Sequence, residues 1–150
     1  MSSDRILTFI LGFSVFGTFF GHGCLATRFV PSWLSYLRVI GVGDKWARIL
    51  MPVIGFMDII IGFFCLFSPT YPLVYCWAFV WGVATAMMRP LAGESIFGLV
   101  ERTGNFCPAL ALLWLNSGRH FGFYLNVCAI MAGALVVSGI ILRSTGLLKK

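Results

Sequence analysis

Charged side chains are scarce in this sequence. They make up 11% of the 150 residues, whereas soluble domains average about 25%. Only five residues are acidic, and the two histidines and five cysteines include no C-x-x-C pair and no other grouping at metal-ligand spacing. A zinc or di-metal site is therefore not expected, and the cysteines are interpreted as small buried apolar residues.

Recognisable catalytic motifs are also missing. The chain contains neither a phosphate-binding P-loop nor a G-x-S-x-G nucleophile elbow. Its net charge of +6 is better explained by basic connections between apolar segments than by a nucleic-acid surface. Nucleic acid is therefore not an expected partner, and membrane lipids are.

Long apolar segments are what the sequence has instead. Hydrophobic residues make up 59% of the chain, and about 20 consecutive apolar residues are enough to cross a bilayer core as a helix. We predict an all-α integral membrane protein, a single domain over residues 1–150 that forms a bundle of five transmembrane helices. The expected spans are about 6–26, 47–67, 73–88, 95–115 and 121–142.

The basic residues alternate between the two sides of this predicted bundle. Nine of the eleven, including Lys149 and Lys150, fall on one side, and only Arg5 and Arg119 fall on the other. The positive-inside rule then predicts a multi-pass protein of a bacterial cytoplasmic or organelle inner membrane, with its N-terminus outside and its C-terminus inside. Haem is not expected in this arrangement, because the two histidines, His22 and His120, fall on opposite sides.

Local signals add detail to the connections and to helix packing. Pro31 and Gly41 bracket a short amphipathic helix over 32–40, which we expect at the membrane surface. Residues 68–72 are expected to form a tight turn. In the first span, Gly17 and Gly21 have the four-residue spacing that lets two membrane helices approach closely.

The stretch from 88 to 115 combines polar residues with a long apolar segment. If it forms one helix, Glu94, Gly98, Glu101 and Asn105 fall on one face at steps of four, three and four. Polar side chains are costly in lipid, so this face should contact protein or water. In the second span, Gly55, Asp58 and Gly62 likewise share a face. That register puts Asp58 near the middle of the membrane.

The predicted topology brings the unusual polar residues of four helices into the inner half of the membrane. These candidate binding residues are His22, Asp58, Arg89, Glu94, Glu101, Arg102 and Asn105. One interpretation is a polar pocket that takes a head group, a quinone ring or a proton. The other is that the two arginines pair with Asp58 and the two glutamates and so fasten the bundle together. The sequence alone leaves both open.

These residues resemble motifs of the DoxX-like membrane proteins over roughly residues 6–115. The matching positions are His22 and Gly23, then Gly55, Asp58 and Gly62, then Gly93 with Glu94 or Glu101. The resemblance implies a four-helix core, to which residues 121–142 would add a C-terminal helix. It also implies a link to thiosulfate or quinone-dependent oxidation, in which some relatives act as membrane subunits. Asp58 stands where glutamate is commoner in that family.

Three functions are compatible with the sequence. The first is a non-catalytic accessory or assembly subunit of a larger membrane complex, working with other membrane subunits or as a homo-oligomer. The second is a quinone-linked redox protein with its polar pocket on the inner side. The third is a small transporter or lipid-binding protein. The cofactor is unknown at this point, with a quinone or a bound lipid as candidates.

Overall fold

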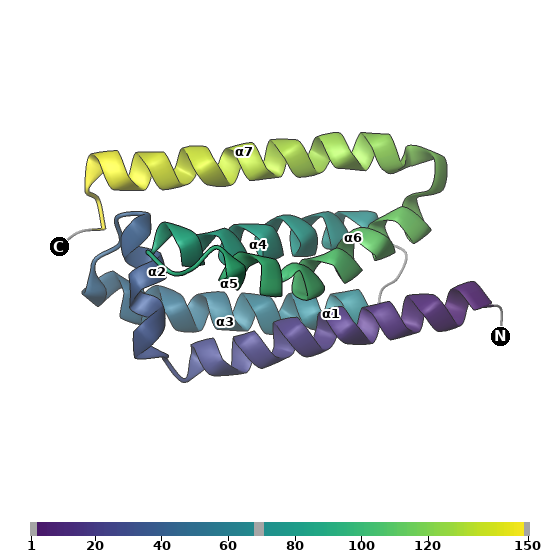
Figure 1. Ribbon diagram of the computed structural model, residues 1–150, viewed down its shortest axis with the longest axis horizontal. Coiled ribbons are helices and arrows are strands. Elements are labelled where there is room, and N and C mark those ends of the chain that lie inside the picture. Colours follow the sequence, from purple (N-terminus) through teal and green to yellow (C-terminus); the bar gives the residue numbers. More distant parts are fainter. Residues whose placement is uncertain (1–2, 68–70, 149–150) are drawn as a thin grey trace.

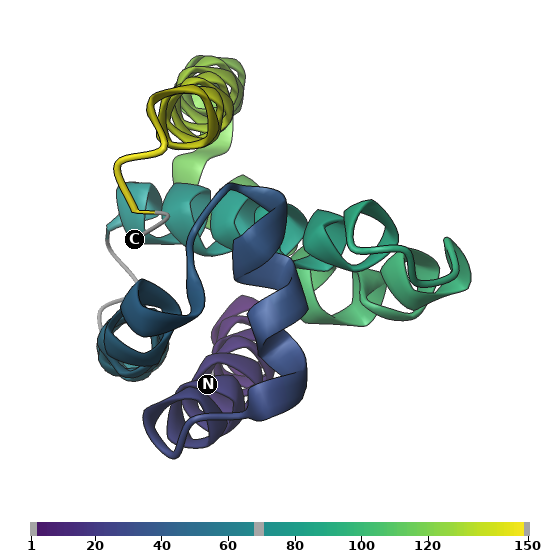
Figure 2. The same ribbon diagram turned by 90° about the vertical axis from the view of Figure 1, so that its left-hand side faces the viewer.

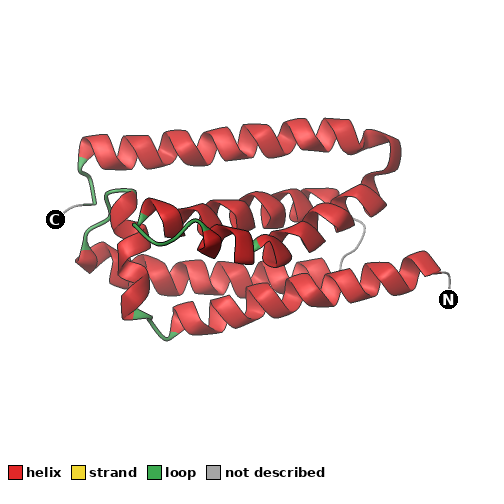
Figure 3. Cartoon of the chain, in the orientation of Figure 1, coloured by secondary structure: helices red, strands yellow, loops and turns green. Residues whose placement is uncertain are grey.

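The computed structural model describes residues 3–67 and 71–148, and within these ranges the chain is helical without a strand (Figure 3). The predicted all-α fold is confirmed. Residues 68–70 of the predicted turn, and Lys149 and Lys150 of the basic tail, lie outside the described residues. The elements are α1 (Ser3–Thr27), η1 (Pro31–Trp33), α2 (Leu34–Val39), α3 (Asp44–Phe67), α4 (Pro72–Leu91), α5 (Phe97–Glu101), α6 (Thr103–Ser117), η2 (Gly118–His120) and α7 (Phe121–Thr145).

The long helices form three layers (Figures 1 and 2). One layer is the pair α1 and α3, the middle layer is α4 with α6, and α7 packs on α4 at the far side of that layer. The short helix α2 crosses the end of the bundle where α1 finishes. That end also holds the last turn of α7, while the start of α1 lies at the opposite end.

Three helical stretches are long and apolar enough to cross a membrane. They are Ser3–Thr27, Asp44–Phe67 and Thr103–Thr145, the last of which runs through α6, η2 and α7. Their outward surfaces are strongly apolar: Phe56 on α3 is 62% exposed and Ile130 on α7 is 72% exposed. Such surfaces are typical of contact with lipid rather than water.

Glycines let α1 and α3 approach each other backbone to backbone. A Cβ atom on Gly23 would lie 2.6 Å from the Gly55 carbonyl oxygen, and one on Gly55 would lie 2.7 Å from the Gly23 carbonyl oxygen. The predicted close approach through Gly17 and Gly21 is wrong, since a Cβ at either position would meet nothing within 4 Å. Gly23, two residues after Gly21 in sequence, is on the face that meets α3.

The predicted single helix over 95–115 is interrupted. Gly93, with φ of +93°, follows the end of α4, and the chain then forms the one-turn-long α5 before α6 begins at Thr103. The break at Arg102 coincides with a competing side-chain bond, in which the Thr103 hydroxyl donates to the Val100 carbonyl at 2.9 Å. The expected single polar face is therefore wrong, because Glu94 precedes α5, Glu101 ends it, and Asn105 belongs to α6.

The short helix after α1 is confirmed, as η1 followed by α2. Pro31 opens it, and Gly41, with φ of +84°, follows its end, as the sequence predicts. The Gly43 amide then donates to the Leu148 carbonyl at 2.7 Å, so residues after α7 are tied to the loop before α3. This contact brings the end of α7 over the same end of the bundle as α2.

The glycine contact predicts a large difference between two Gly→Ala substitutions on α1. Gly23→Ala should destabilise the protein by about 1–3 kcal/mol, because the new methyl group meets the backbone of α3. Gly17→Ala, with open space around it, should be neutral or stabilising by up to about 1 kcal/mol. Unfolding in mixed micelles with increasing dodecyl sulfate measures both. Equal effects would contradict the packing described.

Candidate functional site

A partly open cavity of about 320 Å³ lies between α3 and α4. It exists because α3 packs chiefly against α1, while α4 packs chiefly against α6 and α7. Side chains from α1, α2, α6 and α7 complete the wall, and most of the lining is apolar. Its apolar residues include Phe19, Ala26, Leu37, Ile40, Met51, Ile54, Ala84, Ala86, Leu135 and Leu142.

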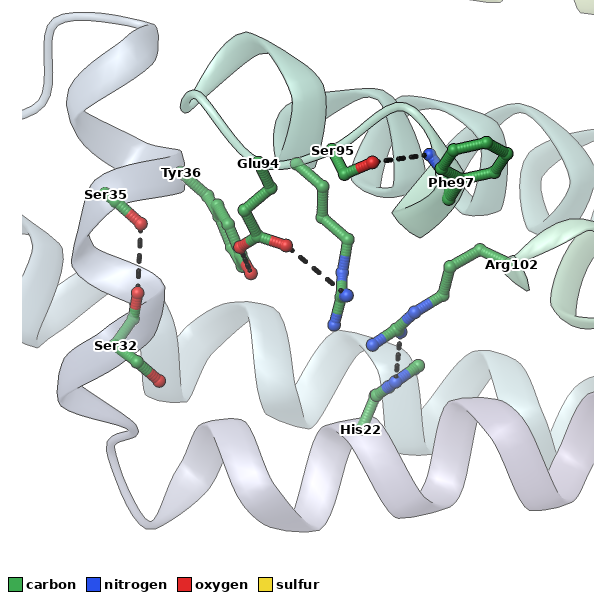
Figure 4. Close-up of polar contacts among 9 residues, drawn as sticks. His22, Ser32, Ser35, Tyr36, Glu94, Ser95, Phe97 and Arg102 are labelled. Atoms are coloured by element: carbon green, nitrogen blue, oxygen red, sulfur yellow. Dashed lines mark hydrogen bonds and ion pairs between the residues drawn. The ribbon is translucent and has the colours of Figure 1, made fainter. Parts of the chain in front are cut away.

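The polar lining near the α2 end of the cavity includes His22 and Arg102, which contact each other (Figure 4). The Arg102 Nη1 atom lies 2.7 Å from His22 Nε2. A guanidinium group can only donate, so His22 Nε2 must be the acceptor. The geometry therefore requires a neutral imidazole whose proton is on Nδ1. The Trp33 ring packs edge-on against this imidazole at 6.0 Å between centroids.

Glu94 connects a second arginine to α2 at the same end of the bundle. One carboxylate oxygen lies 3.4 Å from Arg89 Nη1, and the other accepts a hydrogen bond from the Tyr36 hydroxyl (Figure 4). Partial burial raises the pKa of Tyr36 above its usual value, and the bond to Glu94 raises it further. The phenol therefore stays protonated at neutral pH and remains a donor to Glu94.

Asp58 is the deepest polar group of the lining. Its side chain is buried, at 7% exposure, and its Oδ1 accepts a hydrogen bond of 2.8 Å from Trp81 Nε1. Asp58 is 14 residues into α3, which is about 21 Å along the helix axis. The bond joins α3 to α4 across the cavity and satisfies a group that would be costly to leave unpaired.

The seven candidate residues of the sequence analysis have three different positions. Five of them line the cavity: His22, Asp58, Arg89, Arg102 and Asn105. Glu94 lies at the cluster through its contacts with Arg89 and Tyr36. Glu101 is exposed at the end of α5 and does not line the cavity.

Among the charged candidate residues, all of which the structure describes, mutual pairing accounts for one contact. Arg89 pairs with Glu94, as that interpretation expects. Over residues 3–67 and 71–148, however, neither Arg102 nor Asp58 forms a salt bridge, and their partners are His22 and Trp81. Among the described residues, the ion pairs that this interpretation expects for Asp58 and Glu101 are therefore absent, and the pairing of Arg89 with Glu94 is present.

Sequence reasoning missed Tyr36 and the role of Trp81. In the structure, Trp81 donates the hydrogen bond that satisfies the Asp58 carboxyl group. Tyr and Trp each combine an apolar ring with a polar tip, so they can donate a hydrogen bond to a buried carboxyl group. Among the described residues, no three His, Cys, Asp or Glu side chains come together as a metal site would require.

No protein-family model, curated protein or solved structure matches this chain. The resemblance to DoxX-like proteins therefore stays a prediction that rests on the motifs around His22 and Asp58.

The Asp58 hydrogen bond gives a prediction with a matched control next to it. Trp77 and Trp81 stack with their rings 5.7 Å apart, but only Trp81 donates to Asp58. Trp81→Phe should reduce stability by about 1–3 kcal/mol more than Trp77→Phe, because it leaves a buried carboxyl group without its donor. Thermal unfolding in detergent compares the two variants. A larger loss for Trp77→Phe would show that the stack, and not the hydrogen bond, holds this contact.

Proposed function

We propose that this protein is a multi-pass membrane protein that binds an amphiphilic molecule inside its helix bundle. The observation that carries this proposal is the cavity between α3 and α4, which has an apolar wall and a polar group of His22, Arg89 and Arg102 near one end. Pockets of about 300 Å³ or more with few polar groups are typical of small-molecule binding. A ligand with an apolar body and a polar head matches both parts of this lining.

Five passes through the membrane are part of the proposal. Helices α1, α3 and α7 have 24 or 25 residues, and α4 has 20, so each reaches about 30 Å or more. Helix α6 has 15 residues and is too short alone, so α5 would complete the fourth pass as a broken span. With the N-terminus outside, the polar end of the cavity would face the inner side.

The position of α2 favours ligand binding over the accessory-subunit function expected from the sequence. An amphipathic surface helix could dock another protein, but here Tyr36 and Leu37 of α2, and Ile40 at its C-cap, belong to the wall of the chain's own cavity. Its polar contact, from Tyr36 to Glu94, is also internal. A quinone-linked redox function and a lipid-binding function both remain compatible with an amphiphile in this cavity.

Filling the cavity tests the proposal. Ala84 lines the cavity, so Ala84→Phe places a ring in the space the ligand would use. Native mass spectrometry of the protein released from its own membrane should show a retained small molecule, and this mass should be lost in Ala84→Phe. The control is Ala132→Phe, at an exposed position of α7 that does not line the cavity. It should keep the ligand.

Two results would contradict this function. The first is a wild-type protein that retains no small molecule and gains no stability from added lipids or quinones. The second is equal ligand retention in Ala84→Phe and wild type, which would place the ligand outside the cavity. If the protein instead forms a complex of fixed stoichiometry with other polypeptides and retains no small molecule, that result would favour the accessory-subunit function.

The proposed topology predicts which ends of the chain a membrane-impermeant thiol reagent reaches. Cys65, Cys76 and Cys128 are buried, so replacing Cys24 and Cys107 by Ala gives a protein whose remaining native cysteines should react little with the reagent. In intact cells, Ser3→Cys should react and Ser144→Cys should not, since their ends lie outside and inside respectively. Both should react after the membrane is opened. The reverse pattern would invert the orientation, and labelling of both in intact cells would exclude an odd number of passes.

A further inference from the structure

Two guanidinium groups belong to the lining of one cavity. Arg89 comes from the last turn of α4, and Arg102 comes from the junction of α5 and α6. Both are only partly exposed. Two cations brought close together next to an apolar space repel each other and lose hydration. Such an arrangement needs negative charge to stabilise it.

The described carboxylates supply only part of that charge. Glu94 pairs with Arg89 and is shared with the Tyr36 hydroxyl. Arg102 contacts the neutral ring of His22 and forms no salt bridge within residues 3–67 and 71–148. Glu101 is solvent-exposed, and Asp58 accepts its hydrogen bond from Trp81 deeper in the bundle. At the cavity, Arg89, Arg102 and Glu94 together carry one net positive charge, while Glu101 attracts Arg102 from an exposed position that does not line the cavity.

Each of the two arginines also has more N–H donors than its described contacts use. A guanidinium group has five N–H donors, and its planar fork matches the oxygens of a carboxylate or phosphate. The described contacts of Arg102 include one with His22, and those of Arg89 include one with Glu94. The remaining donors can bind an acceptor with several oxygens. A quaternary ammonium head group would instead meet like charge.

We infer that the ligand of this cavity is a single-chain amphiphile with an anionic head group, a phosphate or a carboxylate, bound by Arg102 and Arg89. This inference rests on the proposed function and adds the chemical class of the ligand. The head group lies at the arginines, and the chain runs along the apolar wall of α3 and α4 toward Trp81. A cavity of about 320 Å³ is at the small end of ligand pockets, which favours one chain over two.

A ligand series that changes only the head group tests this inference. The probes are 1-oleoyl lysophosphatidic acid, oleic acid and 1-monooleoylglycerol, which carry a phosphate, a carboxylate and a neutral head on the same acyl chain. Inorganic phosphate alone is the fourth probe. Native mass spectrometry titrations of the full-length protein in a neutral detergent give a Kd for each. At least one of the two anionic lipids should bind roughly tenfold or more tightly than monooleoylglycerol, as charge-assisted hydrogen bonds provide.

Three arginine substitutions then locate the preference. Arg102→Gln and Arg89→Gln should each lower affinity for the anionic lipid roughly tenfold and leave monooleoylglycerol binding within about twofold. Retained monooleoylglycerol binding also shows that the cavity is intact in the variant. Arg28→Gln is the control, because Arg28 is exposed at the same end of the bundle and does not line the cavity. It should change neither Kd.

Several outcomes would overturn the inference while leaving the proposed function in place. Equal affinity of wild type for all three lipids would point to a neutral ligand such as a quinone, and this comparison needs no variant. An equal loss in Arg28→Gln and Arg102→Gln would show general attraction to a basic membrane surface. Binding of inorganic phosphate as tightly as the lipid would make the site one for a free anion. If no amphiphile binds, the proposed function fails as well.

Discussion

The backbone contact between α1 and α3 is the constraint on which the interior of this protein depends. Gly23 and Gly55 let the two helices meet without intervening side chains. On the other side of the bundle, Gly82 of α4 lies against Phe106 of α6, where a Cβ atom would be 2.9 Å from the phenylalanine Cβ. Helices α3 and α4, which border the cavity, thus each pack closely on a different partner. The space between them is therefore a consequence of close packing elsewhere.

The polar groups around that space differ in depth and in partner. The Trp81 indole donates a hydrogen bond to the Asp58 carboxyl group far from the helix ends, while Arg102 and His22 contact each other nearer to α2. Arg89, Glu94 and Tyr36 then join α4 to the helix that crosses the end of the bundle. Only the last group contains an ion pair. A membrane interior penalises a cation without a negatively charged partner. Among the described residues of this cluster, Arg102 is the cation that forms no salt bridge.

The helices could be predicted because their cause is local. Apolar segments of about 20 residues, ended by Pro and Gly, identified α1, α3, α4 and α7 to within three residues at each end. The convergence of His22, Arg89 and Arg102 could be anticipated too, because antiparallel helices bring alternate ends together. Neither inference needed knowledge of which faces touch.

The partners could not be predicted, because they depend on rotation and on contacts between distant segments. The sequence-based choice of Gly21 as a packing residue was two positions away from Gly23, which is the glycine that meets α3. The break at Arg102 removed the polar stripe that a continuous helix would have formed, and placed Glu101 outside the cavity. The interpretation of mutual pairing gave Arg102 an acidic partner and Asp58 an arginine, whereas His22 and Trp81 are the neighbours that packing supplies.

The most direct test of a ligand-binding interior is a crystal structure of the protein purified with its native lipids. We expect elongated density between α3 and α4 that ends within hydrogen-bond distance of the Arg102 guanidinium, with the Trp81–Asp58 bond preserved beside it. A structure in which α3 packs directly on α4, and Arg102 pairs with Glu94 or Glu101, would contradict it. In that case the polar cluster would serve only to hold the helices together.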